Sequence, residues 1–263
     1  MSFFAVEDVS LAFGGIQALR GVTFSVERGE VFAIIGPNGA GKTSVFNVIT
    51  RVFDADSGRI TAAGCDITAI PRHEVIRHGI ARTFQNIELF EGATVMQNLL
   101  LGRHRHRSGG PVAATAAFMR DLYFTPATRR AEVEARERVE DIIELLELEP
   151  WRDAPVSGLP YGVRKVVELG RALAAEPQLL LLDEPASGLN PEETRDLSFW
   201  IEDVRDELGM TVLMIEHDMS LVTQAADRVL AMHQGEVLTV GTPEDVTRHP
   251  DVVAAYLGTG GPP

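Results

Sequence analysis

The chain has 263 residues, of which 45% are apolar, and it carries a formal net charge of −14. This length suits one large α/β domain or a core with a smaller insertion, and two independent full domains are not expected. The negative charge disfavours sequence-independent binding of nucleic acid. The single cysteine, Cys65, excludes an intramolecular disulfide, which fits a reducing compartment.

Neither a membrane span nor a secretion signal is expected in this chain. No apolar run approaches the roughly 18 residues of a spanning helix. Residues 1–13 lack a basic stretch followed by a long apolar one. If the chain serves transport, the path of the solute is therefore expected to belong to other chains.

Three short apolar runs predict buried parallel strands. The first, 31–35, breaks at Gly36 as a buried strand should, and the runs 179–182 and 211–215 have the same character. Acidic or histidine residues follow the second and third runs. Since the carboxyl ends of parallel strands gather at one edge of a sheet, the segments that follow the three runs are expected to meet at one site.

Composition changes after about residue 90 toward helix formers and returns after about residue 160 to alternating strands and helices. This change predicts an inserted helical subdomain. Inside it, apolar residues at spacing i, i+3, i+4 and i+7 predict the buried stripe of a surface helix. The stripe consists of Val139, Ile142, Ile143 and Leu146.

A phosphate-binding loop is the strongest motif in the chain. Residues Gly36, Pro37, Asn38, Gly39, Ala40, Gly41, Lys42 and Thr43 match G-x-x-x-x-G-K-[ST] between a predicted strand and a predicted helix. Glycine conformations let backbone N–H groups point at phosphate oxygens, and the helix N-terminus adds its positive dipole end. We expect Lys42 to reach the β- and γ-phosphates of ATP and the Thr43 hydroxyl to bind Mg²⁺.

Two carboxylates follow the run 179–182. Asp183 is expected to hold Mg²⁺, usually through water, and Glu184 to polarise the attacking water as a general base. An acidic pair after a strand can instead cap a helix. The phosphate-binding loop in the same chain makes that alternative weak.

Three further residues indicate nucleotide contacts only because the chain also has a phosphate-binding loop. His217 follows the third strand and could contact the γ-phosphate, although such a histidine alone is more often structural. Gln85 could sense Mg²⁺ and the attacking water where the insertion begins. Phe13 could stack on adenine, although by itself it more often belongs to a core.

The order of these motifs resembles the nucleotide-binding subunits of ABC transporters over essentially the whole chain. The resemblance implies a P-loop NTPase (RecA-like) α/β core with an N-terminal antiparallel β part and an inserted helical subdomain. It implies a single domain over 1–263, with the core at 1–86 and 165–263 and the subdomain with its signature motif at 87–164. It also implies ATP and Mg²⁺ as cofactors.

The resemblance assigns roles to single residues as well. Catalysis falls to Lys42, Gln85, Glu184 and His217, and the metal to Thr43, Gln85 and Asp183. Nucleotide binding falls to Phe13, to the loop from Gly36 through Thr43 with the following Ser44, and to the signature residues Leu159 and Gly162. In the family, the signature of one subunit caps the γ-phosphate held by the other.

The signature departs from the family's usual Leu-Ser-Gly-Gly-Gln. Residues 159–163 read Leu-Pro-Tyr-Gly-Val, so Pro160 offers neither a hydroxyl nor an N–H, and Val163 offers no amide side chain. Backbone donors near Gly162 and the helix dipole remain. We therefore expect a weakened contact with the partner rather than none.

Among subfamilies, the chain resembles the longer ATP-binding subunit of branched-chain amino-acid importers. The segments that carry this resemblance are 81–86, 160–162, 188–194, 216–219 and 241–258. It implies an import ATPase at the cytoplasmic face of the membrane. Its partners would be a second ATP-binding subunit, identical or paralogous, two membrane permease subunits and, indirectly, an external solute-binding protein, with no nucleic acid. Residues Asn86, Ile87, Leu89 and Phe90 would form the docking surface for a membrane subunit, unless they pack in the core.

Other functions fit less well. A urea or amide importer and an ATPase of the lipopolysaccharide-exporter type share these features, so the assignment of the solute rests on analogy alone. A soluble ABC ATPase that acts on DNA or ribosomes usually has two joined halves or long insertions. A small-molecule kinase would have no use for a signature helix or a switch histidine, and a non-hydrolysing regulatory subunit would not need Lys42, Asp183, Glu184 and His217 together.

Overall fold

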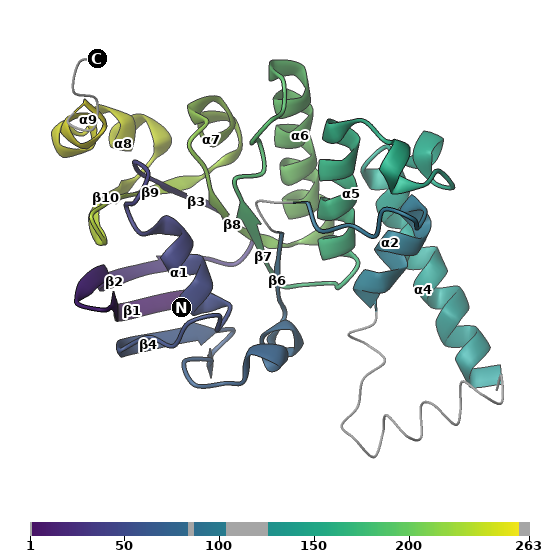
Figure 1. The fold of residues 1–263 in the computed structure, drawn as a ribbon, viewed down its shortest axis with the longest axis horizontal. Helices are drawn as coiled ribbons and strands as arrows, with labels where there is room; N and C mark the ends of the chain where they lie inside the picture. The colour runs from purple at the N-terminus through teal and green to yellow at the C-terminus, as the bar shows by residue number, and fades with distance from the viewer. Residues whose placement is uncertain (1, 84–86, 104–125, 258–263) are drawn as a thin grey trace. The chain divides into compact units, whose positions relative to one another are not determined.

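The computed structural model describes residues 2–83, 87–103 and 126–257 (Figure 1). Contacts divide the chain into a first compact unit, Met1–Gln85 with Gln178–Pro263, and a second, Asn86–Pro177. These divisions fall after residues 85 and 177, and the domain boundaries expected after residues 86 and 164 remain a prediction. Within the described ranges, no helix has both the length and the apolar character needed to cross a membrane.

The N-terminal part of the first unit is an antiparallel sheet, as expected. Its strands follow the order β2-β1-β4-β5, and every neighbouring pair in it is antiparallel. The strands are β1 (Phe4–Phe13), β2 (Ile16–Val26), β4 (Ser57–Ala62) and β5 (Cys65–Asp66). Gly58 lies where β4 passes β1, and a Cβ atom at this residue would lie 2.5 Å from the Asp8 carbonyl oxygen, so only glycine fits there.

A second sheet, of six strands, forms the centre of the first unit. Its order is β10-β9-β3-β8-β7-β6, with all neighbours parallel except the edge pair β10 and β9. The strands are β3 (Val31–Ile35), β6 (Ile80–Arg82), β7 (Leu179–Asp183), β8 (Thr211–Ile215), β9 (Arg228–His233) and β10 (Glu236–Gly241). The three buried runs of the sequence are thus neighbouring strands, and β3, β7 and β8 are buried at every position, as strands covered on both faces must be.

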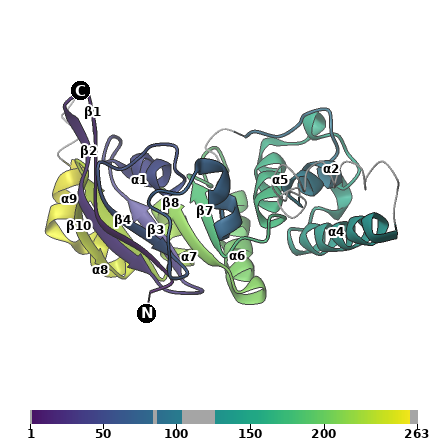
Figure 2. The same ribbon diagram turned by 90° about the horizontal axis from the view of Figure 1, so that it is seen from below.

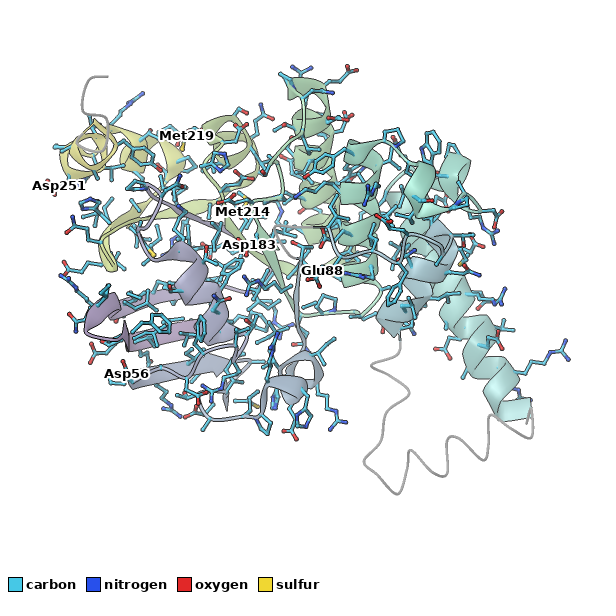
Figure 3. All side chains as sticks on the ribbon, viewed as in Figure 1. Asp56, Glu88, Asp183, Met214, Met219 and Asp251 are labelled. Carbon is cyan, nitrogen blue, oxygen red and sulfur yellow. The ribbon has the colours of Figure 1, made fainter. Side chains whose placement is uncertain are left out.

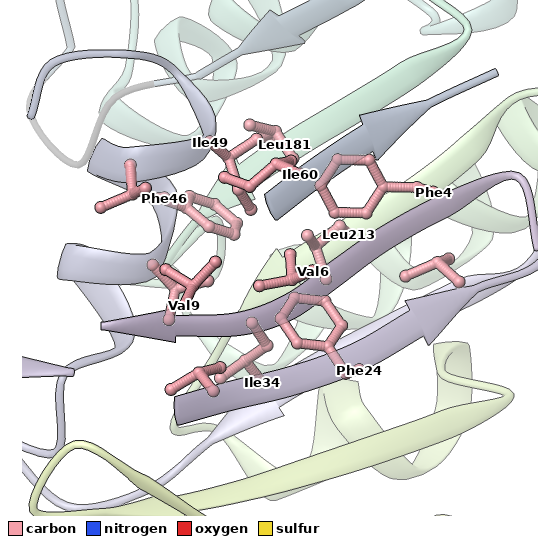
Figure 4. Packing of buried hydrophobic residues seen from close by; sticks show 14 of the residues in the cluster. Phe4, Val6, Val9, Phe24, Ile34, Phe46, Ile49, Ile60, Leu181 and Leu213 are labelled. Carbon is pink, nitrogen blue, oxygen red and sulfur yellow. The ribbon is translucent and has the colours of Figure 1, made fainter. Parts of the chain in front are cut away.

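One hydrophobic core joins the two sheets and helix α1 (Lys42–Ile49) (Figure 4). Because side chains alternate along a strand, every second residue of the six-stranded sheet enters this core, among them Phe32, Ile34, Leu181 and Leu213. Their neighbours in sequence face the opposite side of the sheet. Figure 2 shows α1 on one side of that sheet and α6, α7 and α8 on the other.

The first unit has five helices within its described residues, and α6 has clear signals at both ends. They are α1, α6 (Pro191–Leu208), α7 (Met219–Ala225), α8 (Pro243–Arg248) and α9 (Pro250–Leu257), with a 3₁₀ segment at Arg72–His78. Helix α6 starts with a capping box, in which the Asn190 side chain accepts from Glu193 N–H while the Glu193 side chain accepts from Asn190 N–H. It ends at Gly209, whose φ of +62° is the left-handed conformation that stops a helix.

The second unit is helical within its described residues. It contains α2 (Val95–Gly102), α4 (Pro126–Leu145) and α5 (Tyr161–Leu173), with 3₁₀ turns at Glu149–Trp151 and Val156–Gly158. The predicted apolar stripe is confirmed, because Val139, Ile142, Ile143 and Leu146 are all buried. A Cβ atom added to Gly102 would lie 2.2 Å from the Arg171 carbonyl oxygen, so α2 and α5 approach each other closely at this glycine.

Truncation of a core side chain tests this account of the first unit. Leu213 is fully buried in β8, and Leu213→Ala should lower the free energy of unfolding by about 2–5 kcal/mol through lost burial and the cavity left behind. The same change at Leu208, which is 44% exposed at the end of α6, should cost less than about 0.5 kcal/mol. Urea denaturation measures both, and equal losses would contradict the assignment of the core.

Candidate functional site

Three strands end side by side at one edge of the six-stranded sheet. The register pairs Ile34 of β3 and Asp183 of β7 with the same residue, Ile215 of β8. The main chain continues this alignment beyond the strands, since Glu216 N–H donates to the Ile34 carbonyl and Glu184 N–H donates to the Ile215 carbonyl. Figure 3 labels Asp183, the last residue of β7, and Met214, the last residue but one of β8. The expectation that the segments after these strands meet is confirmed.

The loop between β3 and α1 has a backbone that requires glycine. Gly36, Gly39 and Gly41 have φ values of +153°, +81° and +102°. A Cβ atom at Gly36 would lie 2.3 Å from the Met232 carbonyl oxygen, and one at Gly41 would lie 2.7 Å from the Ala18 carbonyl oxygen. No side chain caps α1 at Gly41. Uncapped N–H groups at a helix start suit an anion such as phosphate.

Lys42 is buried inside this loop. Its Nζ donates to the carbonyl oxygens of Gly36 at 2.7 Å and Pro37 at 3.2 Å. Burial lowers the pKa of Lys42, and the nearby charges of Glu184, Asp183 and Glu216 oppose that shift. The ammonium group therefore lies in the field of the carboxylates at the ends of β7 and β8. Thr43 is exposed and Ser44 half-buried in the first turn of α1.

Asp183 forms a buried ion pair that the sequence analysis missed. Its Oδ2 accepts from Arg82 Nη2 at 2.6 Å, and both side chains are at most 8% exposed. Arg82 Nη1 also donates to Asn47 Oδ1 of α1 at 2.8 Å and to Thr50 Oγ1, at the C-cap of α1, at 3.2 Å. Arg82 thus ties the end of β7 to the helix that follows the loop. An arginine inside a short apolar strand was the available signal, since such a residue is rarely buried without a partner.

Glu184 has an unusual backbone conformation. Its φ is +49°, in the left-handed region that non-glycine residues seldom occupy. Its carbonyl accepts from Ser187 N–H, which closes a tight turn directly after β7, and its side chain is half-buried. Such conformations persist where the surrounding structure holds them, and they gather at functional sites.

His217 and Glu216 follow β8 and differ sharply in exposure. The His217 side chain is 57% exposed, whereas Glu216 is fully buried, with 3.8 Å between His217 Nδ1 and Glu216 Oε2. The Glu216 carboxylate accepts from the backbone N–H groups of Ala186, His217 and Asp218. Glu216 belongs to the segment 216–219, and no role was predicted for it from the sequence.

Phe13 lies at the end of β1 and is 43% exposed, so it does not belong to the core. Its ring packs edge-on against that of Phe53, with centroids 4.9 Å apart. Phe53, which the sequence analysis did not single out, is itself 38% exposed. Two adjacent rings that reach solvent form an apolar surface on which a flat base could stack.

The signature residues lie in the second unit. Leu159 and Gly162 are buried, Pro160 is the N-cap of α5 without a side-chain cap, and Tyr161 is 46% exposed. Gln85 and Asn86 lie outside the described residues.

The segment 87–90 presents one large apolar side chain to solvent. Phe90 is 61% exposed, and Ile87 and Leu89 are half-buried. The fully buried Asn98 holds this segment, because its side chain accepts from Phe90 N–H and donates to the Phe90 carbonyl. Phe90 therefore does not pack in the core.

The sequence pattern of the ABC transporter family matches residues 19–187. A second pattern, described as branched-chain amino acid ATP-binding cassette transporter, matches residues 236–262. The first match contains the phosphate-binding loop, Asp183 at the end of β7 and Glu184 directly after it.

Similar proteins match along nearly their full length. The chain is 42% identical to the high-affinity branched-chain amino acid transport ATP-binding protein BraF of Pseudomonas aeruginosa, over 96% of both chains. It is 38% identical to the corresponding LivG protein of Escherichia coli over 97% of both. It is 33% identical to a probable LivG of Methanocaldococcus jannaschii over 98% of both.

Solved structures agree with these matches. A nucleotide-free ATP-binding cassette from an ABC transporter superposes with a TM-score of 0.82 at 32% identity, covering 97% of this chain and 99% of the other. The ADP conformation of such a cassette superposes with a TM-score of 0.83 at 32% identity, covering 98% and 99%. The expected P-loop NTPase fold class is confirmed.

Loss of Arg82 should destabilise the first unit. Arg82→Met leaves the buried Asp183 carboxylate without its counter-ion and should lower the free energy of unfolding by about 3–5 kcal/mol. Arg20→Met, which removes an exposed arginine from its ion pair with Glu236, should cost less than about 1 kcal/mol. Adding Asp183→Asn to Arg82→Met should recover part of the loss, as measured by urea denaturation. Equal losses for the two single variants would refute a structural role for the buried pair.

Proposed function

Because this chain belongs to the ABC transporter family, we propose that it is the ATP-hydrolysing subunit of an importer whose solute is a branched-chain or other hydrophobic amino acid. The observation that carries the proposal is the convergence of a phosphate-binding loop, two carboxylates and a histidine at the ends of β3, β7 and β8. The solute class is supported by the names of the relatives. A urea or amide importer and an ATPase of the lipopolysaccharide-exporter type are the alternatives.

The loop and the strand ends suit a magnesium-bound nucleotide. The positive φ angles of its glycines and the uncapped start of α1 favour phosphate oxygens. The Thr43 hydroxyl and the Asp183 carboxylate would hold Mg²⁺, and Gln85 would join them. No group of three or more His, Cys, Asp or Glu residues in the described part of the chain could hold a metal alone, which suits an ion that takes ligands from phosphate and water. Mg²⁺ neutralises charge on the phosphates.

In the proposed hydrolysis, Glu184 accepts a proton from the attacking water, and His217 contacts the γ-phosphate from the neighbouring turn. Lys42, now bonded to two loop carbonyls, would turn its ammonium group toward the β- and γ-phosphates. Phosphoryl transfer depends on positioning and charge compensation more than on covalent help from the protein. Phe13 would stack on the adenine, with Phe53 bracing its edge.

The proposed assembly needs other chains. A second ATP-binding subunit would cap the γ-phosphate with the start of its signature helix, and the α5 start of this chain would do the same in return. Pro160 leaves that cap without a hydroxyl, so the contact would rest on backbone N–H groups near Gly162. Two permease subunits would carry the solute, a binding protein would deliver it, and this chain would lie on the cytoplasmic face of the membrane.

Of the proposed docking surface for a permease, Ile87, Leu89 and Phe90 lie within the described residues. Phe90→Glu should weaken binding to the permease by at least about tenfold, because a charge replaces an exposed aromatic anchor, while ATP binding remains. Phe199→Glu changes a ring of similar exposure on α6 (54%) and should leave assembly intact. Co-purification with the permease and ATP affinity are measured for both variants. Normal assembly and transport in Phe90→Glu would refute the docking surface.

Purification of the assembly from its native membrane tests the function as a whole. We expect permease subunits and a paralogous ATPase to accompany the chain, and a binding protein loaded with leucine, isoleucine or valine to stimulate ATP hydrolysis after reconstitution. Glu184→Gln should lower kcat by about a hundredfold or more while ATP still binds. Glu207→Gln, an exposed position on α6, should have no effect. If only urea or amides stimulated hydrolysis, the transported solute would be one of these and not an amino acid. Absence of any membrane partner would overturn the proposal.

A further inference from the structure

The most deeply buried acidic side chain at the site has no role in the proposed hydrolysis. Glu216 has no exposed surface, yet it is an ionisable residue directly after an apolar strand. Burying a charged group is costly unless hydrogen bonds replace the lost water. Its surroundings should therefore show what keeps this residue in place.

Three backbone N–H groups surround the Glu216 carboxylate. Ala186 N donates to Oε1 at 2.8 Å, while His217 N and Asp218 N donate to Oε2 at 2.8 and 3.0 Å. The two bonds at Oε2 are local and shape the turn that carries His217. The bond at Oε1 reaches the turn after the neighbouring strand β7. One carboxylate thus bridges two separate turns of the main chain.

The two bridged turns carry the two groups proposed to act on the attacking water and the γ-phosphate. Ala186 lies two residues after Glu184, inside the turn that the bond from Ser187 N–H to the Glu184 carbonyl closes. Because Glu184 has a φ of +49°, its conformation needs support from outside the turn. The Ala186 bond supplies such support from Glu216, directly after β8.

We propose that Glu216 is a positioning residue, whose carboxylate holds the turn of Glu184 and the turn of His217 in a fixed mutual arrangement. This inference rests on the proposed hydrolytic function. Glu216 has no exposed surface, and it acts by fixing the backbone that carries the side chains of Glu184 and His217. A displacement of about 1 Å at a reacting centre can cost on the order of a hundredfold in rate, so a brace of this kind matters for turnover.

Two substitutions of Glu216 test its hydrogen bonds to the two turns separately. Glu216→Asp keeps the charge and is one methylene shorter, so it can still accept from the adjacent N–H groups, as aspartate does in turns, but it cannot also reach Ala186. Glu216→Gln keeps the length but replaces one acceptor oxygen by an NH₂ donor. That group would face a backbone N–H at one of the two turns.

A matched control separates bracing from general stability. Glu30 is also a buried carboxylate, 7% exposed, that accepts from Glu27 N–H and from Arg228. It precedes β3 and thus lies at the opposite end of the strands from the site. Glu30→Gln should lower the unfolding midpoint without changing turnover.

The experiment combines amide hydrogen exchange of the full chain with the kinetics of the reconstituted assembly. In the unaltered protein, the Ala186 amide should be among the most protected in residues 184–190. In Glu216→Asp it should exchange about tenfold faster or more, as expected when a hydrogen bond to a charged acceptor is lost. ATP affinity should stay within about twofold, while kcat should fall on the order of ten- to a hundredfold. Glu30→Gln should change neither the Ala186 exchange nor kcat.

Three results would overturn the inference. One is an unprotected Ala186 amide in the unaltered protein, which needs no variant to observe. Another is faster Ala186 exchange in Glu216→Asp and Glu216→Gln with unchanged kcat. The third is an equal loss of kcat in Glu30→Gln, which would assign the effect to stability. Failure of the proposed function looks different, because the unaltered assembly would then show no hydrolysis above the level of Lys42→Ala.

Discussion

The parallel register of β3, β8 and β7 is the constraint on which the rest of the site depends. It brings Ile34, Ile215 and Asp183 into one row, so the loop after β3 and the turns after β7 and β8 begin side by side. The strands are buried on both faces. Slipping a strand by one residue would exchange the side chains of its two faces, which differ in size, and would disrupt their close packing. The hydrophobic core therefore keeps the polar groups at the strand ends together.

This arrangement concentrates charged groups where water is scarce. Three of the buried charged side chains at the site each have specific partners. Asp183 has Arg82, Lys42 has two loop carbonyls, and Glu216 has three backbone N–H groups. Buried ion pairs add little net stability, but removal of one partner strongly lowers the free energy of unfolding because the other charge stays buried and unpaired. Their value here is positional, since each joins two elements that carry proposed site residues.

Much of the fold could be predicted from local sequence. Apolar runs bounded by Gly36 and by Asp183 identified the buried strands, and helical spacing identified the stripe that includes Val139 and Ile143. The site residues in the phosphate-binding loop and after β7 and β8 were predicted because their chemistry follows a short contiguous motif. Arg82, Phe53 and the bridging role of Glu216 were missed, since their partners lie far away in the chain.

The sequence by itself determined which segments become strands, where the glycines permit a phosphate-binding turn, and which family the motif order matches. Only the tertiary structure decided that Arg82 neutralises Asp183 across 101 residues and that Glu216 reaches Ala186. The physical reason is the distance along the chain over which each effect acts. Periodicity and turn chemistry act over a few neighbouring residues, whereas a buried charge is satisfied by whichever group the packing of strands and helices brings near it.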